Sequence, residues 1–262
     1  MSLYDQFHQQ FEFVLATSEA DKRYVYRLRY QVYTSEFGHV MPGEPERQLE
    51  YDEFDRSALH CFIRHRATQE PVACIRVIYP GSGHGLRELP IESNSRGEFC
   101  HAELNPDLLP RDLTCEVSRV AILGRYRKRQ PMPEPVPENE GPIYPRTDHD
   151  YKVASLLGVS VYLASTVMIG LMERRHALAL MEPRLARLLG RFGLAFLRVG
   201  NIQQFNGVRA AYYIDQHQAE GALKPELQAF YRDIVGSLSA QFDEPVQGAV
   251  QGRSPVAEYA GS

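Results

Sequence analysis

Residues 113–122 read Leu-Thr-Cys-Glu-Val-Ser-Arg-Val-Ala-Ile, an apolar β-rich run that carries a carboxylate, a hydroxyl and a guanidinium. Successive side chains of a strand point to opposite faces, so we expect Glu116 and Ser118 on one face and Val117 and Arg119 on the other. Ionised groups on a buried strand are costly unless they are paired or used in chemistry. The run therefore predicts a central strand that holds either a buried ion pair or part of an active site.

The segments around this strand predict alternating strands and helices. Ser18 is a helix N-cap candidate, and a polar turn at 66–70 separates two apolar runs that we expect to pair. The order is β-α-β-β-β-α-β-α-β-β, which predicts an α/β or α+β protein with a mixed central sheet flanked by helices. The expected strands are 11–17, 58–65, 71–79, 113–123, 176–181, 195–199 and 208–215, and the expected helices are 18–36, 151–175, 183–192 and 225–241.

We expect one domain over residues 1–242, with a proline-rich inserted loop at 130–146 that can be neither helix nor inner strand. Residues 243–262 show no hydrophobic periodicity and are expected to be a disordered tail. Residues 153–172 carry no charge and are long enough to span a bilayer, but serines and glycines dilute their hydrophobicity. We interpret them as a buried helix.

Composition excludes several classes of protein. The 262-residue chain is 44% hydrophobic and has a net charge of −4, so nothing in it favours nucleic acid as a partner. The polar N-terminus does not resemble a signal peptide, and we expect a cytoplasmic protein. Its four cysteines have no C-x-x-C spacing, so we expect free thiols, and the histidines lack ligand spacing, so we expect no metal.

Four short elements occur in a specific order along the chain. They are Arg29 with Tyr33, Asp52 with Asp55, Arg76 after a short strand, and the Glu116-x-Ser118-Arg119 strand. Over residues 10–215 this order resembles the acyl-homoserine lactone synthases (autoinducer synthases) and the long-chain N-acyl amino acid synthases, and it is most similar to the acyltransferases associated with PEP-CTERM/exosortase systems. The resemblance implies the GNAT acyltransferase fold.

The resemblance also implies transfer of a fatty acyl group from a thioester to an amine, with Glu116, Ser118 and Arg119 as the catalytic group. Glu116 would accept the amine proton, unless it only pairs with an arginine. Ser118 would donate a hydrogen bond near the thioester, and Arg119 would hold the acidic elements in place. The residues implied for substrate binding are Arg29, Tyr33, Asp52, Asp55 and Arg76.

Two of these assignments have structural alternatives. Asp52 and Asp55 would bind the ammonium of an amino acid acceptor, or they would only form an Asx turn or N-cap. Arg29 would fix the acceptor carboxylate, or it would only pair with Asp52.

The stretch 123–130 departs from coenzyme-A-dependent members of this fold, because it has one glycine where their phosphate-binding turn has two. This favours an acyl-acyl carrier protein donor and no tightly bound cofactor. Arg125, Arg127, Lys128 and Arg129 would dock that acidic carrier, or they are a solvated charge run. A peripheral membrane contact is left open.

The chain has no tryptophan, and Gly38-His39 stands where the lactone synthases have Gly-Trp. This favours an N-acyl amino acid synthase over a lactone synthase that uses S-adenosylmethionine. An inactive GNAT-like module that binds lipid or carrier protein is the third alternative.

Overall fold

An eight-stranded sheet runs through the molecule in the order β1-β4-β5-β6-β7-β10-β8, with β9 paired to β10. The computed structural model describes residues 2–80, 88–127 and 148–242. Neighbouring strands are antiparallel except β6 and β7, which are parallel, so the sheet is mixed as predicted. The strands are β1 Phe11–Leu15, β4 Ala58–His65, β5 Glu70–Ile78, β6 Thr114–Ile122, β7 His176–Met181, β8 Leu197–Arg198, β9 Gln203–Gln204 and β10 Val208–Asp215.

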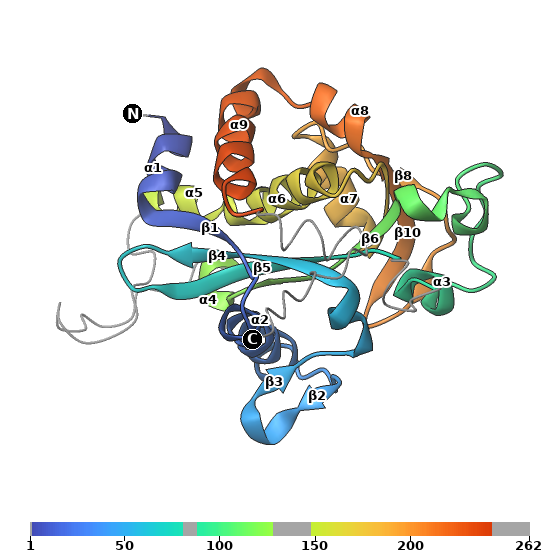
Figure 1. The fold of residues 1–262 in the computed structure, drawn as a ribbon, viewed down its shortest axis with the longest axis horizontal. Helices are drawn as coiled ribbons and strands as arrows, with labels where there is room; N and C mark the ends of the chain where they lie inside the picture. The colour runs from blue at the N-terminus through green and yellow to red at the C-terminus, as the bar shows by residue number, and fades with distance from the viewer. Residues whose placement is uncertain (1, 81–87, 128–147, 243–262) are drawn as a thin grey trace, which may run out of the picture.

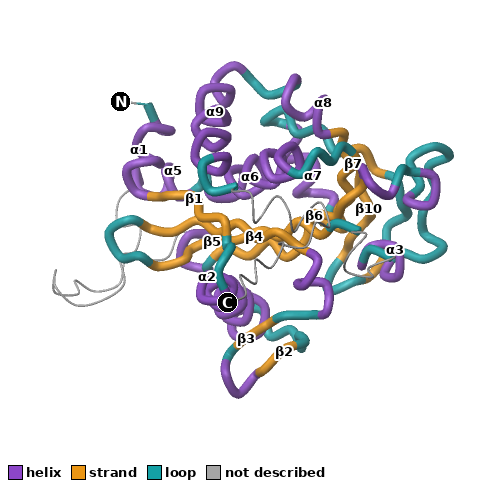
Figure 2. The backbone as a smooth tube through the Cα atoms, in the orientation of Figure 1, coloured by secondary structure: helices purple, strands orange, loops and turns teal. Residues whose placement is uncertain are grey.

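Helices cover both faces of this sheet (Figures 1 and 2). One face carries α2, Glu19–Tyr30, and the small hairpin of β2, Gly43–Glu44, and β3, Leu49–Glu50. The opposite face carries α6, Leu157–Leu171, and α9, Pro225–Ser239. The remaining α-helices are α1 Leu3–Gln10, α3 Pro90–Asn94, α4 Gly124–Arg127, α5 Asp148–Ala154, α7 Pro183–Gly190 and α8 Gln216–Gly221.

The uncharged segment forms the central helix α6, which packs between the sheet and α9. Residues 149–171 are long and apolar enough to cross a membrane, but 83% of the apolar window is buried inside the protein. Contact with the sheet on one side and with α8 and α9 on the other explains why the helix is apolar all round. The expected helix 151–175 is interrupted at Ser155 and Leu156, between α5 and α6.

α2 begins where the sequence predicts, because Ser18 is its N-cap. The Ser18 hydroxyl accepts a hydrogen bond from the Asp21 amide at 3.1 Å, and the Asp21 carboxylate accepts one from the Ser18 amide. After Tyr30 the chain continues as the π-helix η1, Gln31–Glu36, so the expected helix 18–36 changes pitch in its last third. Such wider turns often occur at functional sites.

The short elements were not predicted from the sequence: α1, α3, α4, α8, β9 and the β2–β3 hairpin, which lies between the expected helix 18–36 and the expected strand 58–65. The proline-rich loop 130–146 and the tail 243–262 lie outside the described residues. Cys61, Cys74 and Cys115 are free and buried, as expected, whereas Cys100 is free and exposed.

The strands β6 and β7 are hydrogen-bonded to each other only at their start. Their register pairs residues 114–116 with residues 176–178, although β6 continues to Ile122 and β7 to Met181. The burial of β6 changes at the same point, because Thr114 to Val117 are buried whereas Ser118 to Val120 are only half-buried. Glu116 is therefore the last residue of β6 before the two strands part.

Candidate active site

A β-bulge decides where the side chains of β6 point. On β5, Arg76 and Cys74 are two residues apart, but their partners on β6, Ser118 and Ala121, are three apart. The extra residue coincides with Arg119, which has a φ of 53°. The predicted alternation is therefore wrong at this point, because Arg119 reaches the same carboxylate of Asp52 as Arg76 does.

Three arginines and three carboxylates form one buried network on the face covered by α2. The Arg29 guanidinium makes a bidentate contact with Asp55, at 2.7 and 3.1 Å, and an ion pair with Glu50. The other bonds join Arg76 to Asp52 at 2.6 Å and to Asp55 at 2.8 Å, and Arg119 to Asp52 at 2.7 Å and to Glu50 at 3.0 Å.

The network is neutral as a whole, and each charge in it depends on the others. Arg29, Glu50 and Arg76 are at most 1% exposed. Burial alone would raise the pKa of Asp55, but the Arg29 and Arg76 guanidinium groups outweigh it and hold that pKa far below its usual value. Because an unpaired buried charge is so costly, loss of any one member should destabilise the fold.

Asp52 and Asp55 form the turn that was one of the two alternatives for them, and their binding of an acceptor ammonium stays a prediction. They form a capping box, in which Asp52 accepts from the Phe54 amide at 3.0 Å and Asp55 from the Asp52 amide at 2.7 Å. Both also bind arginines, so the turn serves to present two carboxylates to the network. Arg29 pairs with Glu50 and Asp55, whereas the sequence analysis considered Asp52 as its partner.

Glu116 stands apart from the ion pairs of this network. Its Oε2 atom accepts a hydrogen bond from the Ile91 amide, in the first turn of α3, at 2.7 Å. Burial, opposed by that hydrogen bond and by the charges of Arg76 and Arg119, raises the pKa of Glu116 to about 7. A carboxyl group with such a pKa exchanges protons readily near neutral pH.

Ser118 lies two residues after Glu116 on β6, and Tyr33 contacts the same strand further along. The Ser118 hydroxyl accepts a hydrogen bond from Arg76 Nε at 3.1 Å, which leaves its own proton free to be donated. The Tyr33 hydroxyl, on η1, donates to the Val120 carbonyl at 2.7 Å. Tyr33 therefore holds η1 against the part of β6 that has no strand beside it on the β7 side.

Two buried polar groups near the network have no hydrogen-bond partner in the described structure: Arg76 Nη2 and both ring nitrogens of His60. Burial lowers the pKa of His60 to about 3, although the Asp55 carboxylate, 3.6 Å away, acts in the opposite direction. His60 is therefore neutral at physiological pH. Arg76 Nη2 is a charged donor available to a water or a substrate oxygen.

The expected docking cluster is only partly within the described residues. Arg125 is ion-paired with Glu70, and Arg127 is ion-paired with Glu36 and stacks on the Phe37 ring at 4.3 Å. Lys128 and Arg129 lie outside the described residues. The charges of Arg125 and Arg127 are thus used within the chain, which leaves carrier docking at this cluster a prediction.

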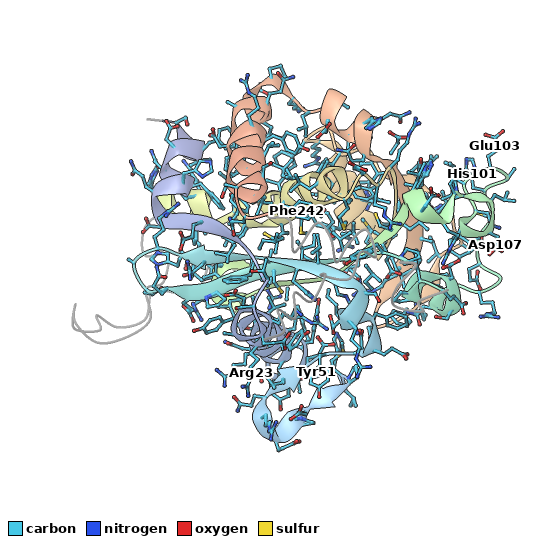
Figure 3. The ribbon with its side chains drawn as sticks, in the orientation of Figure 1. Arg23, Tyr51, His101, Glu103, Asp107 and Phe242 are labelled. Carbon is cyan, nitrogen blue, oxygen red and sulfur yellow. The ribbon has the colours of Figure 1, made fainter. Side chains whose placement is uncertain are left out.

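Sequence reasoning missed Glu50 and the Ile91 amide. Glu50 lies between the expected helix 18–36 and the expected strand 58–65, and only the β2–β3 pairing brings it under α2 (Figure 3 shows the neighbouring Tyr51 beside that helix). Its position directly before Tyr51-Asp52 was the available signal. Among the described residues, no group of three or more His, Cys, Asp or Glu side chains is arranged to hold a metal ion.

Part of the chain matches a known family model. Residues 28–133 match the family model described as an acetyltransferase (GNAT) domain, a range that contains the whole network and Glu116. A search of curated proteins finds no match.

Solved structures share the fold over most of the chain. TofI, in a ternary complex with an inhibitor and MTA, is 19% identical with a TM-score of 0.54, over 83% of this chain and 99% of TofI. BjaI, a CoA-dependent acyl-homoserine lactone synthase solved with SAM and isopentyl-CoA, is 14% identical with a TM-score of 0.52, over 87% and 89%. FeeM, an N-acyl amino acid synthase from uncultured soil microbes, is 11% identical with a TM-score of 0.50, over 84% and 98%. The GNAT fold that the sequence predicted is confirmed.

We expect Arg29→Met to lower the free energy of unfolding by about 3–5 kcal/mol, because it leaves the Glu50 and Asp55 carboxylates buried without their partner. Urea unfolding followed by circular dichroism measures this change. Arg64→Met is the matched control, because Arg64 pairs with Glu12 at a half-exposed site. An equal loss for the two variants would show that the buried network has no special weight.

Arg119→Gly and Arg119→Ala separate backbone strain from charge. Both variants lose the same ion pairs, but only glycine adopts a φ of 53° without steric cost. We therefore expect the alanine variant to be less stable than the glycine variant by about 1 kcal/mol in urea unfolding. Equal stabilities would mean that the bulge relaxes when the arginine is removed.

Proposed function

We propose that the protein transfers a fatty acyl group from acyl carrier protein to the amine of an amino acid, and the match of residues 28–133 to an acetyltransferase (GNAT) domain supports this. The product would be an N-acyl amino acid. The observation that supports this most directly is Glu116, a buried carboxyl group whose pKa is raised to about 7 at the point where β6 and β7 part.

An amine attacks a thioester only in its neutral form, and it must lose a proton as the C–N bond forms. Glu116 would accept that proton, directly or through one water, and pass it to the thiolate that leaves when the C–S bond breaks. The backbone of β6 after Glu116 is not bonded to β7, so N–H groups along this edge would be available to the developing oxyanion.

The network suggests how the acceptor would be held. Arg29 and Asp55 are buried and fully engaged, so their role is to support the site. The side chains of Arg119 and Asp52 are 23% and 13% exposed, so this end of the network is open to solvent. An amino acid would meet a carboxylate for its ammonium there, and an arginine for its carboxylate.

The donor would be carrier-bound because the turn after β6 has little room for a coenzyme A pyrophosphate. That turn has the single glycine Gly124, and its amide donates to the Glu36 carboxylate at 3.1 Å. A carboxylate in this position would repel a phosphate. Charge thus supports a donor that brings no pyrophosphate to this turn.

The acyl chain would lie on the face of the sheet that carries Glu116. The register places Glu116 between Ile78 and Leu178, two members of a second apolar cluster on that face. Leu180 lies two residues after Leu178 on β7 and therefore on the same face. It is only partly buried and packs against the same cluster. Each buried methylene of an acyl chain would contribute about 0.8 kcal/mol.

We expect Glu116→Gln to lower kcat/KM by about 10²–10⁴-fold, because glutamine keeps the Ile91 hydrogen bond but cannot accept a proton. The wild-type rate should rise with pH through about 7, as Glu116 ionises, and this limb should vanish in the variant. The measurement is carrier release from an acyl carrier protein substrate across a pH series.

A stability measurement provides the control for this variant. A raised carboxyl pKa means that the folded state binds more protons than the unfolded state, so the contribution of Glu116 to stability should fall as pH rises from about 4.5 to about 7, opposite in sign to the contribution of His60. Glu116→Gln should flatten that slope and remain folded. A near-wild-type rate in a folded variant would make Glu116 structural.

Leu180→Phe should shorten the preferred acyl chain while leaving turnover of short chains within about threefold, because added volume displaces distal methylenes first. Competition between carrier substrates of different chain length measures the preference. Leu171→Phe is the matched control, since Leu171 is also partly buried but belongs to α6 on the opposite face. An unchanged preference in Leu180→Phe would place the chain elsewhere.

Mass spectrometry of lipid extracts from cells that express the protein tests the proposed function itself. New N-acyl amino acids that disappear with Glu116→Gln are the expected result. Acyl-homoserine lactones would instead identify a synthase that uses S-adenosylmethionine. No new product from either class, with the fold intact, would favour a binding module.

A further inference from the structure

One edge of the molecule is strongly basic although the chain as a whole is acidic. Residues 183–209, which form α7, β8, β9 and the start of β10, contain five arginines and no aspartate or glutamate, whereas the whole chain has a net charge of −4. α7 packs on β10, and β8 and β9 both pair with β10, so these segments lie together. We call this surface the α7–β10 edge.

The outer side of α7 has a regular pattern. Arg184, Arg187, Leu188 and Arg191 follow the spacing i, i+3, i+4, i+7, which places them on one side of a helix, and all four are exposed. The opposite side of the helix is buried through Ala186 and Leu189. The helix therefore presents three cations and one large apolar side chain to solvent.

Large apolar side chains gather at the same edge. Among the described residues, nine large hydrophobic side chains are exposed, and five of them lie between residues 188 and 208. They are Leu188, Leu197, Ile202, Phe205 and Val208, with exposures of 36–56%. Phe205 and Val208 flank the turn between β9 and β10, where Asn206 and Gly207 both have positive φ. Such a concentration marks an interaction surface.

The arginines of this edge are available for a partner. Within the described residues Arg184, Arg187, Arg191 and Arg198 make no ion pair, in contrast to Arg125 and Arg127. The fifth, Arg209, donates to the carbonyls of Phe205 and Asn206 and so fixes the turn. Two acidic residues border the edge: Glu182, the exposed N-cap of α7, and Glu98, whose carbonyl accepts from the Asn201 amide.

We propose that the α7–β10 edge docks the protein on a membrane that contains anionic lipids. Unpaired arginines supply attraction to lipid headgroups, and apolar side chains on a helix and on a hairpin turn can enter the boundary between headgroups and acyl chains. Exposed apolar side chains on a helix and a hairpin turn, set beside unpaired arginines, match the pattern of segments that lie in a membrane interface. The proposal does not depend on the proposed function.

Vesicle co-sedimentation tests it, with the full chain and vesicles of phosphatidylcholine alone or mixed with phosphatidylglycerol. We expect binding to the anionic vesicles only, and weakening as salt is raised. The variant Arg184→Glu/Arg187→Glu/Arg191→Glu should bind about 100-fold more weakly. The control Arg23→Glu/Arg27→Glu/Arg232→Glu, with the same charge change on α2 and α9, should lose far less.

A second variant tests the apolar part. Leu188→Ser/Phe205→Ser/Val208→Ser keeps every arginine, and we expect it to bind anionic vesicles at least about tenfold more weakly. Circular dichroism checks that each variant is folded. No binding to anionic vesicles, or an equal loss in the control, overturns the proposal. The proposal is also overturned if Arg184→Glu/Arg187→Glu/Arg191→Glu binds vesicles as the wild type does but no longer binds an acidic carrier protein. That result would make the edge a protein-docking surface.

Discussion

The buried contact of Arg29 with Asp55 and Glu50 is the constraint on which the other features of the site depend. It joins α2 to the segment between β3 and β4, and through Asp55 it reaches Arg76 on the sheet. Arg29, Glu50, Asp55 and Arg76 are buried, and a lone buried charge costs several kcal/mol, so these four groups are tolerated only when all are present. The network thus stabilises a particular arrangement of four separate segments more than it stabilises the fold in general.

The bulge at Arg119 completes this arrangement and has its own cost. A non-glycine residue with positive φ is strained, and here the strain is offset by contacts with Glu50 and Asp52. Without the extra residue, Arg119 would point to the opposite face of β6, where α6 packs. The bulge follows soon after the last residue pair between β6 and β7, so the change of direction and the parting of the strands occupy the same short stretch.

Glu116 and the network show how position alone separates two roles for carboxylates. Asp55 is surrounded by guanidinium groups and stays ionised, whereas Glu116 on β6 has only an amide hydrogen bond and more distant charges to oppose burial. The first is suited to hold structure and the second to exchange a proton. The arginines differ in a similar way. Arg125 and Arg127, after β6, are ion-paired with Glu70 and Glu36, whereas the arginines of α7 form no ion pair with any residue that the structure describes.

The sequence by itself determined the order of the main elements, the mixed sheet, the buried helix α6 and the four short elements that meet at the site, because hydrophobic periodicity and the residue types of those elements are local properties. Tertiary structure decided the rest. The direction of Arg119 depends on a bulge that pairing with β5 creates, and the partner of Arg29 depends on a hairpin that carries Glu50 beneath α2. Likewise, the raised pKa of Glu116 depends on burial against α3. Burial, register and charge partners are relations between distant segments, and no single stretch of sequence contains them.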